Sequence, residues 1–141
     1  MYVFALTAGL VVLADQAVKM RVQRSGRIVS LGKIGSVRTS DATIWLTRGV
    51  RRGPLTIWAC WVSGAAGLAA AVAILPSLAL WAGLLAGGSL SHALETARRG
   101  RVIDYVCLTF WPAFNLADAL ITIGAAGVLI RLGAAAWKIA A

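Results

Sequence analysis

The stretch VIDYVCLTFWPAFNLAD, residues 102–118, places one carboxylate near each end of an apolar, aromatic segment. The two carboxylates belong to Asp104 and Asp118, in a chain that has only five acidic residues. An ionisable group at the edge of a membrane helix is costly, so it faces protein or water and indicates a functional site. Two such groups predict acid/base chemistry in which carboxylates share a proton. Asn115 shares a predicted helix face with Asp118, three residues on.

Outside this stretch, the composition is that of a membrane protein. Of the 141 residues, 60% are hydrophobic and 13% are charged, and the mean hydropathy is +0.81. A soluble domain of this length could not bury so much apolar surface, whereas lipid removes the need to bury it. We therefore predict a single integral membrane domain over residues 1–141.

The formal net charge of +9 raises the question of nucleic-acid binding, for which a basic excess is the electrostatic signature. Most basic residues, however, lie in the links between apolar segments. One link holds nine of the 14 Lys and Arg residues: Lys19, Arg21, Arg24, Arg27, Lys33, Arg38, Arg48, Arg51 and Arg52. Cations beside membrane helices meet anionic lipid headgroups. We therefore expect membrane lipids as partners, and no nucleic acid.

Four apolar segments predict four transmembrane helices, since about 20 residues are needed to cross a bilayer. The helices are expected over about residues 1–18, 54–75, 78–97 and 113–132, and the stretches between them are expected to be links. The basic link over residues 19–53 carries the β-branched stretches RIVSL and TIWLT, which favour short strands. The predicted fold class is an all-α membrane protein of four transmembrane helices. A small β-rich element should lie on the membrane surface between the first two helices.

Two further pairs of polar residues share helix faces by their spacing. Asp15 and Lys19, at i and i+4, form either an ion pair at a helix end or an anchor that positions the neighbouring site. His92 and Glu95, at i and i+3, are expected to form a hydrogen-bonded pair that lines a polar pocket. The chain has one His, so we expect no metal site and no other cofactor.

Three motifs, taken in this order, resemble those of signal peptidase II, the prolipoprotein signal peptidase of bacterial membranes. They are DQAVK at residues 15–19, GGSLSHALETARRGRVIDY at residues 87–105 and WPAFNLAD at residues 111–118. The match covers nearly the whole chain in motif order. It implies four transmembrane helices with a small β-rich cradle, and a multi-pass location in the bacterial cytoplasmic (inner) membrane.

The resemblance also implies an activity. Members of that family are aspartyl endopeptidases that cleave lipid-modified prolipoproteins just before the diacylglyceryl cysteine. By motif, Asp104 and Asp118 correspond to the two aspartates that activate a water. Like charges held close cannot both ionise, so one carboxylate stays protonated to polarise the carbonyl while the other takes the water's proton. The expected substrate-binding residues or active-site neighbours are Asp15, Lys19, His92, Glu95 and Asn115.

The end of the third apolar segment departs from the family pattern. The family has Gly-Asn-x-x-Asp-Arg there, whereas this chain has Ser91, His92, Glu95 and Thr96 at the corresponding positions. The family's Asn-x-Gly-Ala-Ala-Phe loop has no counterpart, the nearest stretch being SVRTSDATIWL, residues 36–46. A second hypothesis is therefore a diverged relative, catalytic or not, that binds protein partners as an accessory subunit of a larger membrane complex. A third is a four-helix protein whose carboxylates only cap helices.

The charge distribution and the resemblance predict opposite orientations. The links over residues 19–53 and 98–112 lie on one side of the membrane and hold nine and three Lys or Arg residues, against two in the C-terminal tail. The positive-inside rule therefore places the aspartates on the cytoplasmic side. The family's aspartates face outward, where prolipoproteins arrive.

Overall fold

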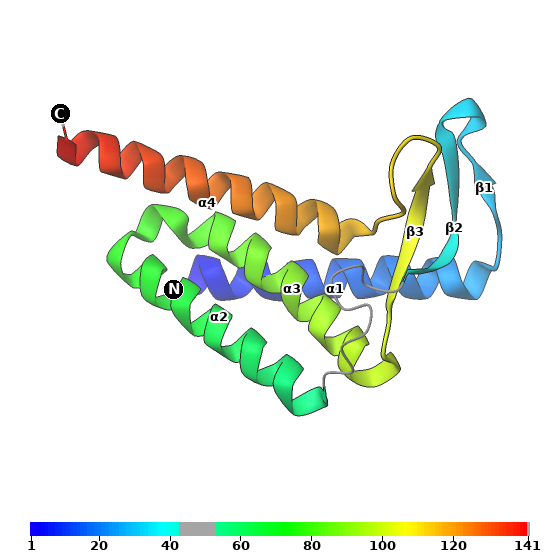
Figure 1. Cartoon of the computed structure of the whole chain (residues 1–141), viewed down its shortest axis with the longest axis horizontal. Helices are drawn as coiled ribbons and strands as arrows, with labels where there is room; N and C mark the ends of the chain where they lie inside the picture. Colours follow the sequence, from blue (N-terminus) through cyan, green and yellow to red (C-terminus); the bar gives the residue numbers. More distant parts are fainter. Residues whose placement is uncertain (43–52, 141) are drawn as a thin grey trace.

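The computed structural model describes residues 1–42 and 53–140. Four long helices are covered at one end by a small antiparallel sheet (Figure 1). Each of these helices is long and apolar enough to cross a membrane, so the predicted fold class is confirmed. The α-helices, strands and 3-10 helices (η) in chain order are α1 (Tyr2–Ser25), β1 (Val29–Ser30), η1 (Gly32–Ile34), β2 (Gly35–Ala42), α2 (Pro54–Ile74), η3 (Pro76–Leu78), α3 (Ala79–Arg99), β3 (Val102–Leu108) and α4 (Leu116–Ala140).

The first helix is longer than the predicted segment over residues 1–18. It runs through Lys19 and ends where Gly26 adopts the left-handed conformation, with φ of 57°, and donates its N–H back to the last turn. The predicted helix stops at the first charged residues, but charges end an apolar span and do not end a helix. Asp15 and Lys19 consequently lie inside α1, so a pairing at a helix end is wrong.

The other helices also differ from their predicted ranges. Helix α2 begins with a proline in its first turn, as predicted. Helix α3 ends two residues later than expected, because the left-handed residue that stops it is Gly100, with φ of 68°. Helix α4 begins at Leu116 instead of residue 113, and it continues past the predicted end at residue 132.

The sheet takes its third strand from a part of the chain where the sequence predicts a link. Strand β3 pairs antiparallel with β2, which is the central strand in the order β1-β2-β3. The stretch RIVSL contains β1, whereas TIWLT, residues 43–47, lies outside the described residues. The pairing of β2 with β3 is close, since a Cβ added to Gly35 would meet the carbonyl oxygen of Cys107. Alternation alone misses β3 because its partner strand is distant in the sequence.

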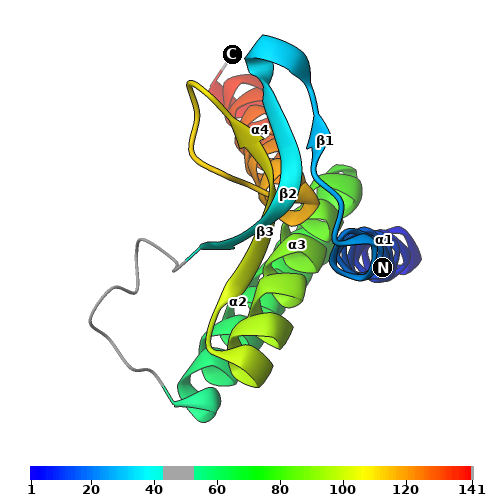
Figure 2. The same cartoon turned by 90° about the vertical axis from the view of Figure 1, so that its right-hand side faces the viewer.

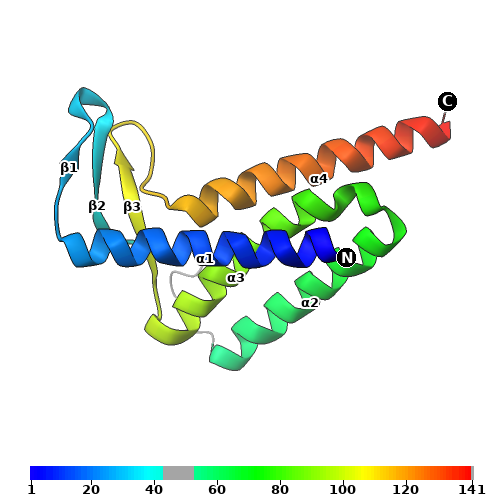
Figure 3. The same cartoon turned by 180° about the vertical axis from the view of Figure 1, so that it is seen from behind.

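Helix α3 is the central helix and contacts the other three. Its glycines allow close approach of the neighbouring backbones: a Cβ at Gly87 would lie 2.6 Å from the carbonyl oxygen of Ala8 in α1. In Figure 3, α1 passes in front of α3, with α2 below and α4 above. Likewise, a Cβ at Gly88 would lie 2.9 Å from the carbonyl oxygen of Ala117 in α4, so small residues bring α1 and α4 close to α3.

The sheet, the end of α1, the end of α3 and the start of α4 meet at one end of the molecule (Figure 1). The N- and C-termini lie toward the other end. Figure 2, which views the sheet end, shows β2 and β3 crossing over the ends of α3 and α4. The sheet therefore holds the chain between α3 and α4 against the helix ends.

Candidate active site

Asp104 and Asp118 are brought together by a single residue, Asn115. Asp104 lies on β3, and Asp118 lies in the first turn of α4. The side-chain Nδ2 of Asn115 donates to Asp104 Oδ1 at 2.7 Å, and its backbone N–H donates to Asp118 Oδ2 at 2.8 Å. Asn115 is itself fully buried. It therefore bridges the two carboxylates from within the protein.

The same asparagine caps helix α4. Its Oδ1 accepts the backbone N–H of Asp118 at 3.0 Å, while Asp118 Oδ2 accepts the backbone N–H of Asn115. This reciprocal arrangement is a capping box, with Asn115 at the N-cap and the acid three residues on. The two backbone N–H groups between them bond to Tyr105 and Asp15. Local sequence thus places Asp118, and residues of other elements hold it there.

The two carboxylates lie in different environments. Asp104 is 7% exposed, whereas 36% of the Asp118 side chain is exposed. Burial raises the pKa of Asp104 above the ordinary aspartate value of 3.8, and the nearby negative charge of Asp118 raises it further. The hydrogen bond from Asn115 opposes this rise, as do the charges of His92 and Lys19. The pair is therefore asymmetric, with a buried carboxyl that favours its proton and an open one beside it.

His92 approaches the pair from α3. Its Nε2 lies 3.3 Å from Asn115 Oδ1 and 3.4 Å from Asp118 Oδ1. The oxygen of an amide can only accept, so Nε2 is the nitrogen that carries a proton. Glu95 points elsewhere, toward Lys19 and the β3 backbone, so the predicted hydrogen-bonded pair of His92 and Glu95 is wrong. Three residues of separation on a helix leave enough angle for the two side chains to reach different neighbours.

A buried ion group lies behind the two aspartates. Lys19 Nζ is 2.7 Å from Asp15 Oδ2 and 2.8 Å from Glu95 Oε2, and all three side chains are at most 5% exposed. Asp15 also accepts the N–H of Ala117 in α4, and Glu95 accepts the N–H of Ile103 in β3. The group therefore contacts the backbone next to each aspartate, and its role as an anchor that positions the site stays a prediction.

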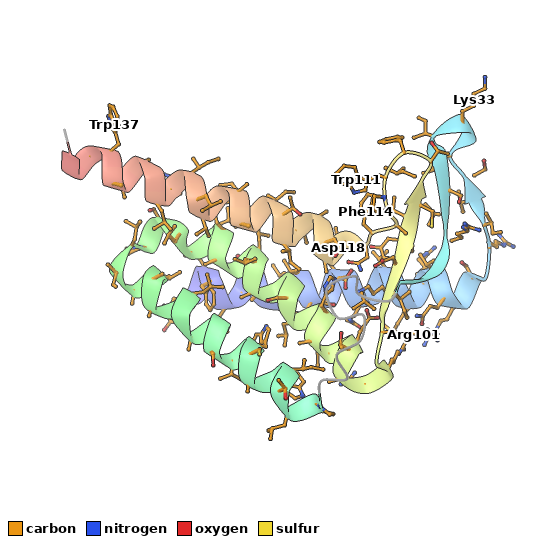
Figure 4. The ribbon with its side chains drawn as sticks, in the orientation of Figure 1. Lys33, Arg101, Trp111, Phe114, Asp118 and Trp137 are labelled. Carbon is orange, nitrogen blue, oxygen red and sulfur yellow. The ribbon has the colours of Figure 1, made fainter. Side chains whose placement is uncertain are left out.

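Two cavities open beside the pair. One, of about 300 Å³, is lined by Trp111, Phe114 and Asp118 with residues of the first turns of α4. Figure 4 shows these three side chains grouped where the β3–α4 loop meets the helix. The other, of about 520 Å³, lies between α2 and α3 and includes Trp61 and His92. Asp118 itself lines the first cavity, whereas the second reaches only His92, which contacts Asp118.

Two residues of this site are given no role by the sequence patterns. Tyr105 ends the motif at residues 87–105, and the structure shows that its hydroxyl accepts the N–H of Leu116 at 2.9 Å. Ser91 donates to Asp15 and accepts from Gln16 at 2.8 Å. A polar side chain inside an apolar helix is the one signal that could have identified Ser91. Among the described residues, His, Cys, Asp and Glu side chains form no group of three that could hold a metal ion.

Comparison with protein families gives a match along most of the chain. The family model described as Signal peptidase (SPase) II matches residues 7–133. A lipoprotein signal peptidase of Paraburkholderia phymatum is 32% identical over 136 residues, which cover 84% of this chain and 80% of that protein. One of Halothermothrix orenii is 44% identical over 50 residues, so the aligned part spans only 34% of that relative.

The fold also has a solved counterpart. The structure of a bacterial membrane enzyme superposes with a TM-score of 0.76 at 20% sequence identity. The superposition covers 94% of this chain and 93% of that one. The similarity therefore includes the arrangement of the helices and the sheet together.

Proposed function

Because the chain belongs to the signal peptidase II family, we propose that it is an aspartic endopeptidase that cleaves lipid-modified prolipoproteins before the diacylglyceryl cysteine. Asp104 and Asp118 are its catalytic residues. The observation that carries the proposal is the bridge of Asn115 between a buried carboxylate and an open one. No metal or other cofactor takes part in the proposed reaction.

The different surroundings of the two aspartates support a different role for each in the proposed reaction. Asp104, whose pKa is raised by burial, keeps its proton and donates a hydrogen bond to the carbonyl oxygen of the scissile amide. Asp118 faces the N–H of Asn115 and His92 Nε2, donors that suit an ionised carboxylate. It is also the more exposed of the two, so an attacking water can reach it.

The reaction then proceeds through water addition to the amide. Asp118 takes a proton from the water as the oxygen bonds to the carbonyl carbon, and the hydrogen bond from Asp104 stabilises the developing negative charge on the carbonyl oxygen. The C–N bond breaks next, and the proton held by Asp118 passes to the leaving amine. The products are a free carboxylate and the new N-terminus of the lipidated cysteine.

The remaining predicted residues support this pair in the proposal. Asp15, Lys19 and Glu95 hold the backbone of β3 and α4, and Asn115 fixes the two carboxylates relative to each other. His92 lies between Asp118 and the cavity that α2 and α3 enclose, so it is placed to contact the substrate.

The accessory-subunit hypothesis rests on the departures at the end of α3, on the missing loop and on the inverted charge distribution. Glu95, however, pairs with Lys19 and accepts the N–H of Ile103, so the longer acid has partners that suit it. His92 retains a hydrogen-bond donor toward Asp118. These contacts support the enzymatic proposal. Purification in mild detergent separates the two, since an accessory subunit should carry a stable partner in fixed stoichiometry.

Replacing Asp118 by Asn tests the proposal. The amide keeps an oxygen that can accept the N–H of Asn115, so the capping box and the fold should persist, while the base is lost. Wild-type protein in detergent should cleave a lipidated prolipoprotein, and Asp118→Asn should show no cleavage above background. Thermal unfolding and gel filtration of both proteins check that the fold is unchanged. Cleavage by Asp118→Asn at the wild-type rate would rule out the assignment.

A further inference from the structure

Tyr105 is a buried titratable residue that the proposed reaction does not use. It follows Asp104 on β3 and is 6% exposed. Burial raises its pKa to about 12, and the charges of Asp15, Asp118 and Asp104 act in the same direction. The hydroxyl therefore stays neutral across the working range of an enzyme, close to three carboxylates.

The hydroxyl of Tyr105 is one of four side-chain acceptors at the start of α4. The first N–H groups of a helix have no acceptor within the helix, and here each has a side chain. For the N–H groups of Asn115, Leu116, Ala117 and Asp118, the acceptors are Asp118, Tyr105, Asp15 and Asn115, at 2.8, 2.9, 3.2 and 3.0 Å. Two of these bonds form within the capping box. The other two join α4 to β3 and to α1.

The bond from Leu116 to Tyr105 completes a contact between the two segments that carry the aspartates. The backbones of Val106 and Phe114 already pair, with N···O distances of 2.9 and 3.0 Å. That pairing stops before the helix begins. The next hydrogen bond along the two segments joins Asn115 to Asp104. The one after it joins Leu116, in the first turn of α4, to Tyr105.

We propose that the Tyr105 hydroxyl is a positioning group: by holding the Leu116 N–H it sets the first turn of α4, and with it Asp118, relative to Asp104. The inference rests on the proposed function and adds a residue to its site. Leu116 precedes Asp118 by two positions in one helical turn, so a rotation of that turn moves the Asp118 carboxylate. Reacting groups tolerate little displacement before the rate falls.

Replacing Tyr105 by Phe removes the hydroxyl and keeps the buried ring. We expect kcat for cleavage of a lipidated prolipoprotein to fall about tenfold. KM should stay within about twofold, because in this inference the hydroxyl acts on the Leu116 N–H and not on the substrate. Tyr2→Phe is the matched control, since Tyr2 is 94% exposed and the same atom is removed there without a contact to the site. A raised KM at unchanged kcat, or lower thermal stability with neither constant changed, would overturn the positioning role.

A second variant removes the other partner of the bond. Proline is tolerated at the first position of a helix, so Leu116→Pro takes away the N–H while α4 can still begin there. On that background, Tyr105→Phe should change kcat less than about twofold, because the two partners act through one bond. A tenfold loss on both backgrounds would show that the hydroxyl acts elsewhere and would overturn the inference.

Amide hydrogen exchange separates this inference from the proposed function. In detergent micelles, the Leu116 amide should exchange about tenfold faster in Tyr105→Phe than in wild type, with Tyr2→Phe unchanged. Unchanged exchange at Leu116 overturns the positioning role of Tyr105, whether or not the protein cleaves a prolipoprotein. Wild-type protein that cleaves nothing overturns the proposed function. Faster exchange at Leu116 would then show that the bond between Tyr105 and Leu116 is a structural contact only.

Discussion

At the scale of single residues, the site consists of two aspartates in different environments. Asp104 is enclosed by the sheet and by Asn115, whereas Asp118 opens onto the cavity beside Trp111. Burial disfavours the charged form of a carboxyl, and a second carboxylate nearby disfavours it further. Asn115 prevents the two from drifting apart, since one residue bonds to both.

The pH dependence of cleavage should report the Asp104 proton. The reaction uses protonated Asp104, so the rate should fall as the pH rises through its raised pKa, on an alkaline limb above the ordinary value of 3.8. The profile of kcat/KM against pH measures this limb in the free enzyme. A rate that is already falling at or below the ordinary aspartate range would contradict the assignment of Asp104 as the acid.

The same proton contributes to stability, with a sign that can be checked in a variant. The folded protein holds the Asp104 proton more tightly than the unfolded chain does, because its folded pKa is the higher one. This contribution is fully present below the unfolded pKa and is lost as the pH rises through the folded pKa. Thermal unfolding should therefore show a smaller loss of stability over that range in Asp104→Asn than in wild type.

At the scale of elements, α3 and α4 are held together by close backbone contact. A Cβ added to Gly124 of α4 would lie 2.7 Å from the Leu85 backbone nitrogen and 2.8 Å from the Trp81 carbonyl oxygen in α3. Without a hydrophobic driving force between helices in lipid, such packing is what keeps them associated. The start of α4, where Asp118 lies, depends on the position of this helix.

Gly124→Ala should therefore destabilise the protein. The added methyl meets backbone atoms that cannot turn aside, so we expect a loss of about 1–3 kcal/mol in the free energy of unfolding. Gly67→Ala in α2 is the matched control, because a Cβ there would meet nothing within 4 Å, and its effect should stay within about 0.5 kcal/mol. Thermal unfolding in one detergent compares the two. Equal stability of both variants would contradict close packing of α3 on α4.

At the scale of the whole molecule, the described acidic residues lie mainly in the interior, and the basic residues lie mainly on the surface. Four of the five acidic residues, Asp15, Glu95, Asp104 and Asp118, lie in or behind the site. Among the side chains that the structure describes, those that are both charged and exposed are all Lys or Arg. Most of them lie at the sheet end, where Arg101 and Lys33 are seen in Figure 4. This basic end can bind anionic headgroups on whichever side of the membrane it lies.

The proposed function requires the sheet end to face outward, against the positive-inside rule. Lys33 and Trp137 mark the two ends of the molecule and are both exposed (Figure 4). In a background without Cys60 and Cys107, Lys33→Cys should react with a membrane-impermeant maleimide added outside the cell membrane. Trp137→Cys, the matched control, should react only once that membrane is opened. The reverse pattern would place the aspartates in the cytoplasm, away from lipidated prolipoproteins.

The sequence alone was sufficient to predict the four membrane helices and the family, and it singled out the two aspartates to which Asn115 bonds. Each of these is local: a helix that crosses a bilayer needs an uninterrupted apolar run, and the motif WPAFNLAD contains the cap and the acid of one helical turn. The pairing of Asp15 with Lys19 also follows from helix periodicity. Helix ends were less predictable, because α1 continues past its charges until Gly26.

Only the tertiary structure decided which partners these residues have. Asp15 accepts the N–H of Ala117 across 102 positions of the chain, and Glu95 turns to Lys19 instead of His92. β3 becomes a strand because β2 lies beside it, and Tyr105 reaches α4 only because β3 is held there. Hydrogen bonds and ion pairs between distant segments depend on how the helices and the sheet pack. A sequence pattern within one segment does not predict that packing.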